Sequence, residues 1–258
     1  MDKPVEVKPV DQPVALPTIR FGLTHFAVGN DIYSNFRKQM QVSSNYGEKG
    51  TYNKIQAVAF FDALPDLVSS TLTAAQLKEK YDVLFVGVHV SSLTSAHVPK
   101  LKEFLSLKGC LILAFEHTPN QQADAVLKQF EHGAATPGYL GNLGGVGVFA
   151  GTEYNGSSSS KEGLSNCFGD TLGVPLKGTG AMIITEDKLS AGSKVIASSG
   201  NSVLMWLMGG TKGRAVAFSD IDLLAYDFAG DAIDTGQKKF FHNMVAYIFD
   251  QVLAAPQS

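Results

Sequence analysis

The sequence predicts an α/β protein with a mainly parallel sheet, and three observations lead to this prediction. Short apolar runs alternate with segments of helical periodicity through the first half of the chain, which is the pattern of right-handed βαβ units. The run at residues 81–89 (YDVLFVGVH) is almost continuously apolar, as expected for a parallel strand covered on both faces. The chain has 258 residues, 45% of them hydrophobic, so it can bury a substantial core.

The elements of the first half follow in order along the chain. Apolar runs predict strands at residues 18–24, 55–61, 81–89 and 111–117. Apolar residues that recur every three or four positions predict helices at residues 31–41 and 95–109, between these strands, and at residues 120–130, after the last of them. Pro99 fits only the first turn of the second helix, Gly109 suits its C-terminal end, and Asn120 can cap the third helix.

The second half of the chain differs in composition and in the spacing of its predicted strands. Residues 138–170 are rich in glycine and serine and predict a long loop region, in which only residues 146–150 resemble a strand. Closely spaced strands are predicted at residues 194–198, 203–208 and 214–218, separated by the turn signals SGN and GGTKG. The single tryptophan, Trp206, lies within the second of these strands and is expected in the core. A final amphipathic helix is expected to be capped by Asp234 or Thr235.

The first 17 residues differ from the rest of the chain. They hold four prolines among charged residues, a composition that favours an extended, unpacked leader. Residues 18–254 are expected to form one domain. Such a leader is compatible with a periplasmic or secreted protein whose export signal has been removed, and equally with a cytoplasmic protein that has a flexible terminus.

The charge, hydropathy and cysteine content of the chain argue against a nucleic-acid partner, a transmembrane helix and a disulfide framework. The chain has 21 basic and 24 acidic residues without a dense basic block, so nucleic acid is not an expected partner. No apolar run reaches the roughly 20 residues of a transmembrane helix. Cys110 and Cys167 could form one bridge, but two free thiols are expected, with Cys110 half buried beside a strand.

The order of the segments resembles a known superfamily. The run LTAAQLKEKYDVLFVGVHVSSLTSAHVPKLKEFLSLKGCLILAF, and the ending GRAVAFSDIDLLAYDF followed by QKKFFHNMVAYIF, are similar to class I glutamine amidotransferase-like domains. The resemblance is to the non-catalytic branch, found in gliding-motility proteins, in intraflagellar transport proteins and in uncharacterised bacterial proteins. It implies a three-layer α/β/α, flavodoxin-like domain with a mainly parallel sheet.

In the catalytic members of this superfamily, a cysteine stands on a tight strand-to-helix turn inside a G-x-C-x-G motif. The matching turn here is FEHT, at residues 115–118, which has no cysteine, no serine and no flanking glycine. Cys110 lies about five residues away, roughly 17 Å at the rise of a strand, and cannot substitute. Amidotransferase chemistry is therefore not expected.

Polar side chains nevertheless follow the predicted parallel strands. In open parallel sheets ligands bind outside the carboxyl ends of the strands. The residues found there in this sequence are His25, His89, Glu116, His117, Asp220 and Asp222. The first four could assemble a metal-assisted hydrolase or sugar-binding site, or they could be solvated turn residues and caps. Asp220 and Asp222 could bind a ligand, but accepting backbone N–H groups in the following loop is the favoured role.

These observations lead to three hypotheses about the function of the chain. The first is a non-enzymatic binding or scaffold domain of an envelope-associated or transport assembly, with a protein partner or a small-molecule ligand. The second is a metal-assisted small-molecule or sugar hydrolase, and the third is a cytoplasmic ligand sensor. No cofactor is predicted, because the glycines at residues 138–151 match neither G-x-G-x-x-G nor a P-loop.

Overall fold

The computed structural model describes residues 15–24, 31–64, 71–87, 95–115, 121–132, 142–143, 146–147, 153–158, 164–179, 181, 184–225 and 228–255. In the first half of the chain the elements are β1 (Thr18–Thr24), α1 (Asp31–Gln41), β2 (Ala57–Leu64), α2 (Ala74–Lys80), β3 (Val83–Gly87), the short 3₁₀ helix η2 (Ser95–His97), α3 (Val98–Ser106), β4 (Cys110–Ala114) and α4 (Gln121–Gln129). In the second half they are β5 (Asn142–Leu143), β6 (Val146–Gly147), β7 (Glu153–Ser158), β8 (Pro175–Thr179), η3 (Glu186–Lys188), β9 (Lys194–Ser199), β10 (Ser202–Leu207), β11 (Ala215–Phe218), η4 (Ile221–Leu224) and α5 (Gly236–Leu253).

The main sheet has the order β2-β1-β3-β4-β11-β10-β9-β7-β8. Its first five strands pair in parallel, in the flavodoxin-like order 2-1-3-4-5. From β11 onward every neighbour is antiparallel, so that β10, β9, β7 and β8 extend the parallel half sideways. The predicted α/β class and the parallel sheet are confirmed, and the antiparallel extension is an addition to them.

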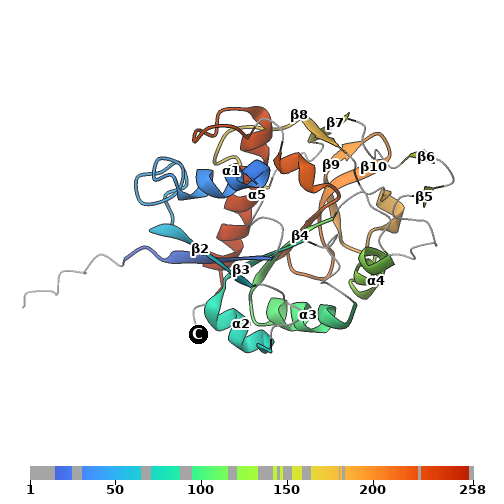
Figure 1. Ribbon diagram of the computed structural model, residues 1–258, viewed down its shortest axis with the longest axis horizontal. Helices are drawn as coiled ribbons and strands as arrows, with labels where there is room; N and C mark the ends of the chain where they lie inside the picture. Colours follow the sequence, from blue (N-terminus) through green and yellow to red (C-terminus); the bar gives the residue numbers. More distant parts are fainter. Residues whose placement is uncertain are drawn as a thin grey trace, which may run out of the picture.

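Alternating residues of the central strands β3, β4 and β11 face two separate cores, and helices cover both (Figure 1). On β4, Cys110, Ile112 and Ala114 pack with α1 and α5 on one face. Leu111 and Leu113 pack with α2, α3 and α4 on the other face. Burial on both faces explains why the central strands β3 and β4 read as continuous apolar runs. The three-layer arrangement is therefore confirmed.

The segment between β2 and β3 contains a helix, α2, that sequence periodicity did not single out. It is only seven residues long and begins with a capping box: the Thr73 hydroxyl accepts from the Gln76 amide, and the Gln76 side chain accepts from the Thr73 amide. The pattern Thr-x-x-Gln before Leu77 was the available signal. Short helices carry too few turns for periodicity to reveal them.

The prediction of a long loop at residues 138–170, with a strand only at residues 146–150, is wrong at residues 153–158. β7 lies within it, although its sequence, EYNGSS, has little strand propensity. It forms because its backbone pairs with β8 on one side and with β9 on the other. Pairing with neighbours that are distant in sequence outweighs local preference here.

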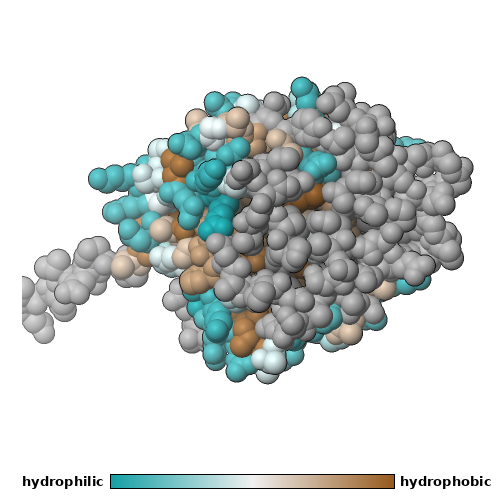
Figure 2. All heavy atoms as spheres, in the orientation of Figure 1, coloured by the Kyte–Doolittle hydropathy of each residue, from teal (hydrophilic) through white to brown (hydrophobic). Residues whose placement is uncertain are grey.

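Exposed apolar surface is limited in the part of the chain that the structure describes. The large apolar side chains that are well exposed there are Phe61, Leu107 and Leu172. On the face shown in Figure 2, hydrophobic residues that reach the surface are scattered among hydrophilic ones. Within the same described residues, no helix combines the length and apolar character needed to cross a bilayer.

Candidate functional site at the carboxyl edge of the parallel strands

The parallel half of the sheet has a topological switch point at its carboxyl edge. From β1 the chain passes through α1, on one face, to β2 at the outer edge of the sheet. From β3 it passes through α3, on the opposite face, to β4. The direction of winding therefore reverses between Thr24 and Gly87, the last residues of β1 and β3. In this topology a ligand binds outside such a switch point.

The four candidate catalytic residues follow the strands that end at this edge. His25 follows β1, His89 follows β3, and Glu116 and His117 follow β4. The three strands are consecutive neighbours in the sheet and run parallel, so their carboxyl ends lie side by side. The four residues themselves lie outside the described residues, and the convergence of their side chains stays a prediction.

Asp220 has a clear structural position at the same edge. It follows β11, is fully buried, and caps η4 by accepting the Asp222 amide at 2.7 Å. η4 is in turn fixed to α5, because the Gln237 side chain donates to the Leu223 carbonyl at 2.7 Å. The backbone-accepting role expected for Asp220 is observed, while ligand binding by Asp220 or Asp222 stays a prediction.

Neither thiol is activated. Both cysteines are free. Cys110 is fully buried rather than half buried, because its side chain faces the core under α5, and burial raises its pKa to about 11. Cys167 donates to the Thr51 carbonyl at 3.4 Å, and burial raises its pKa as well. Both are therefore protonated thiols at neutral pH and poor nucleophiles.

His242 is held neutral inside α5. Its Nδ1 lies 2.8 Å from the Tyr46 hydroxyl and its Nε2 lies 2.8 Å from Gln39 Oε1. Because Gln39 Oε1 can only accept, Nε2 carries the proton and Nδ1 accepts from Tyr46. Burial, with a smaller contribution from the nearby charge of Lys238, lowers the pKa of His242 to about 3. The ring is a satisfied core group.

His132, at the end of α4, is a second buried histidine. Its Nδ1 accepts the Ser190 amide at 2.9 Å, and its ring packs edge-on against Trp206. Burial lowers its pKa to about 4. Sequence reasoning singled out neither His132 nor His242. The signal for His242 was its position on the apolar face of the last helix, between Phe241 and Met244.

Polar side chains of α5 hydrogen-bond to strand β8 and to the loop at residues 168–169. Gln237 forms a two-way pair with the Lys177 backbone, and Asn243 accepts the Phe168 amide and donates to the Gly169 carbonyl. These contacts explain the buried polar character of α5 without a ligand. Among the described residues there is no group of three or more histidine, cysteine or acidic side chains placed to hold a metal ion.

Comparison with solved structures shows the fold. A cytoplasmic protein of Salmonella typhimurium LT2, STM1381, matches with a TM-score of 0.54 at 11% identity, covering 89% of this chain and 99% of that chain. A second cytoplasmic protein of Salmonella typhimurium, STM3548, matches with a TM-score of 0.53 at 9% identity, covering 89% and 98%. At such identities these likenesses show a shared fold alone.

Structures with lower scores include the mmIFT52 N-terminal domain, with a TM-score of 0.49 at 11% identity and coverage of 93% of this chain and 99% of that chain. A glutamine amidotransferase matches with a TM-score of 0.44 at 13% identity, covering 91% and 99%. The likeness of fold to the two bacterial proteins agrees with the sequence resemblance, which included uncharacterised bacterial proteins. No protein-family model and no curated protein matches the sequence.

Proposed function

We propose that this chain is a non-enzymatic binding domain that acts as a scaffold within a larger envelope-associated or transport assembly, with a protein or small-molecule partner. The observation that carries the proposal is a flavodoxin-like sheet in which β4 leads into a segment that has no cysteine or serine. β4 ends at Ala114. The residues that follow, FEHTPN, include neither cysteine nor serine at the place where catalytic members of the superfamily that this sequence resembles have their nucleophile. Both thiols elsewhere are protonated at neutral pH.

A specific observation also favours a second function, a metal-assisted hydrolase. β1, β3 and β4 are adjacent and parallel, so the segments that carry His25, His89, Glu116 and His117 begin at neighbouring strand ends. Imidazole and carboxylate are the ligands that zinc and manganese accept. The two functions differ in whether these four side chains are required.

A complementation experiment distinguishes them. In cells that lack the gene, we expect a variant with His25→Ala, His89→Ala, Glu116→Gln and His117→Ala to restore the wild-type phenotype fully. A core-disrupted variant, Leu113→Asp, serves as the control and should fail, because it places a charge among the buried side chains of β4. Purified wild-type protein should release no ammonia from glutamine.

The opposite outcome would support the hydrolase. A folded quadruple variant that does not complement, together with stoichiometric zinc or manganese in wild-type protein that is lost in a His89→Ala/His117→Ala variant, would contradict the scaffold proposal. Circular dichroism of the variant establishes that it is folded.

A further inference from the structure

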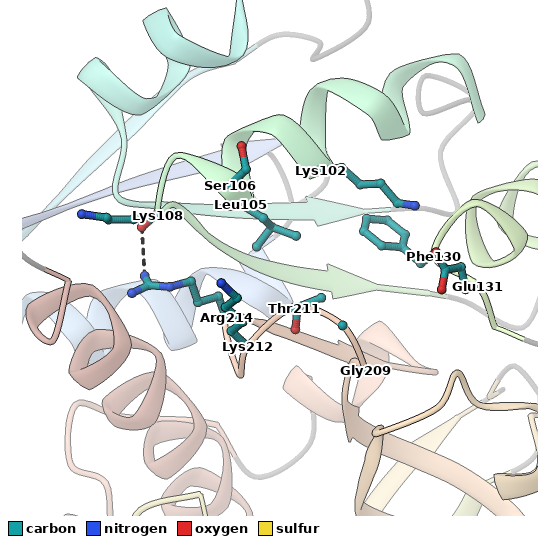
Figure 3. A pocket seen from close by; sticks show the side chains of 11 residues that line it. Lys102, Leu105, Ser106, Lys108, Phe130, Glu131, Gly209, Thr211, Lys212 and Arg214 are labelled. Atoms are coloured by element: carbon teal, nitrogen blue, oxygen red, sulfur yellow. Dashed lines mark hydrogen bonds between the residues drawn. The ribbon is translucent and has the colours of Figure 1, made fainter.

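A basic cavity of about 570 Å³ lies at the opposite edge of the sheet from the candidate functional site. Lys108, two residues before β4, and Arg214, directly before β11, line it and so mark the amino ends of these strands. One wall comes from α3 and the end of α4, and the other from the hairpin between β10 and β11 (Figure 3). The volume suits a small molecule.

The charge of this cavity is opposite to that of the chain. Four basic residues line it against a single acid, whereas the whole chain has a formal net charge of −3. The basic residues are Lys102, Lys108, Lys212 and Arg214, and the acid is Glu131. Within the described part of the chain, neither Lys102 nor Lys212 forms an ion pair. Concentrated positive charge in a cavity attracts anions.

The same cavity has an apolar floor. Phe130 and Leu105 line it, and the Lys102 ammonium lies 5.8 Å from the centre of the Phe130 ring. Figure 3 shows Lys102 reaching over this ring from α3, with Lys212 and Arg214 on the facing hairpin. Arg214 is fixed by a 3.0 Å hydrogen bond to the Lys108 carbonyl. Cations thus stand on two sides of a partly apolar space.

Three residues that line this cavity have an unusual backbone conformation. In the described chain the non-glycine residues with positive φ are Lys108 at 68°, Glu131 at 62° and Lys212 at 54°, and all three line this cavity. The left-handed region is unfavourable for residues with a Cβ and is ordinarily filled by glycine.

Two of these residues occupy matching places in two helices. After α3, the Lys108 amide donates to the Leu105 carbonyl at 3.0 Å and the Gly109 amide to the Phe104 carbonyl at 2.9 Å. After α4, the amides of Glu131 and His132 donate in the same way, at 2.9 Å and 3.1 Å, to the carbonyls of Lys128 and Leu127. Both are Schellman motifs in which glycine is the usual residue at the left-handed position. Here both positions carry charged side chains beside one cavity, at a cost in stability.

We propose that this cavity binds a small organic oxyanion, a phosphate or carboxylate attached to an aromatic or apolar group. The oxyanion lies between Lys102, Lys212 and Arg214, and the apolar part lies against Phe130 and Leu105. The site is separate from the carboxyl edge, and the proposal does not depend on the scaffold function.

The neighbouring cavity, of about 630 Å³, is a useful contrast. Two of its three basic residues, Arg20 and Lys78, are paired with Asp82, at 2.7 Å and 3.1 Å, and the third, Lys108, also lines the first cavity. An anion there would have to displace an existing carboxylate, so we assign no anion site to it.

Nuclear magnetic resonance titration of ¹⁵N-labelled protein tests the proposal. The probes are phenyl phosphate, benzoate and the neutral control phenol. We expect saturable amide shifts confined to residues 102–108, 130–131 and 209–214 with at least one anion, and at least tenfold weaker binding of phenol. Tighter binding of phenyl phosphate than of benzoate assigns the ligand to phosphates, and the reverse order assigns it to carboxylates.

Variants separate binding from folding. Lys102→Ala/Lys212→Gly should weaken anion binding at least tenfold, while its melting temperature stays unchanged or rises, because glycine suits the backbone at position 212. Lys54→Ala/Lys188→Ala removes the same charge outside the cavity and should bind as the wild type does. Absence of saturable shifts with both anions, shifts centred elsewhere, or unchanged affinity in the cavity variant would overturn the proposal.

Discussion

His242 illustrates how burial fixes the protonation state of a single residue. A charged imidazole would lose its acceptor role toward Tyr46 and would have to be solvated inside a fully buried site, so the neutral form is strongly preferred. His132 is in the same position, since its Nδ1 must accept the Ser190 amide. Neither ring acts as a proton-transfer group near neutral pH, because both pKa values lie well below 6.5.

These two histidines predict a pH dependence of stability. Their pKa values in the folded state, about 3 and about 4, lie below the unfolded value of 6.5, so the unfolded chain takes up protons first as the pH falls. Stability is therefore complete above pH 6.5 and declines below it, by up to about 1.4 kcal/mol per pH unit for each histidine. Urea unfolding at pH 7, 6 and 5 measures this decline.

The matched variant is His242→Asn, which removes one of the two titrating groups. It should be less stable than wild type at pH 7, because the hydrogen bonds of Gln39 and Tyr46 are disturbed, but its stability should fall about half as steeply between pH 6 and 5. An unchanged slope would show that His242 does not contribute to the decline.

The sequence predicts the environment of some single residues and not of others, and the difference has a physical cause. Trp206 was correctly placed in the core, because a lone tryptophan within an apolar strand has few alternatives. The backbone partners of His132 and Lys238 could not be predicted, since they lie in loops whose position depends on the tertiary fold. Cys110 was expected to be half buried because the sequence did not reveal that α5 covers it.

At the scale of elements, α5 is held by a buried ammonium as much as by apolar packing. Lys238 is 3% exposed and donates to the carbonyls of Ala229 and Ala232 and to the carboxylate of Asp234, at 2.6, 2.9 and 2.7 Å. The segment before the helix thus folds back onto its first turn. Thr235 adds the N-cap, as its hydroxyl accepts the Lys238 amide.

Replacement of this lysine tests that description. Lys238→Met keeps the length of the side chain but leaves two carbonyls and a carboxylate without their donor, so we expect a loss of about 2–4 kcal/mol in the free energy of unfolding. Lys239→Met, at the next position of the same helix, should change it by less than about 0.5 kcal/mol. Equal effects of the two substitutions, measured by urea unfolding, would contradict this account.

Elements with a strong hydrophobic pattern were predicted well. The strand Thr18–Thr24 and the helix Asp31–Gln41 have the bounds that the pattern indicated, because each buries one face in the core under α1 and α5 and so has a clear periodicity. β8 was not predicted, since its sequence PLKGT begins with proline and includes glycine. It is an edge strand, where proline is tolerated.

At the scale of the whole molecule, the parallel and antiparallel halves of the sheet share their cores. The core under α1 and α5 includes Phe21 and Ile112 of the parallel half together with Leu176 and Ile196 of the extension. The core under α2, α3 and α4 includes Leu111 and Leu113 together with Val203 and Trp206. Apolar side chains on both faces therefore connect the two halves, which favours one cooperative unit over two.

The expectation that residues 18–254 form one domain leads to a final prediction. Trp206, stacked on Phe115 with ring centres 6.1 Å apart, reports on the junction between the two halves, whereas circular dichroism at 222 nm reports mainly on the helices. Because both cores span the junction, the tryptophan fluorescence and circular dichroism transitions in urea should coincide at one midpoint. A fluorescence transition at lower urea than the loss of helix would mean that the antiparallel extension unfolds separately. Its strands would then form a second unit docked on a flavodoxin-like core, contrary to the continuity of the two cores across the sheet.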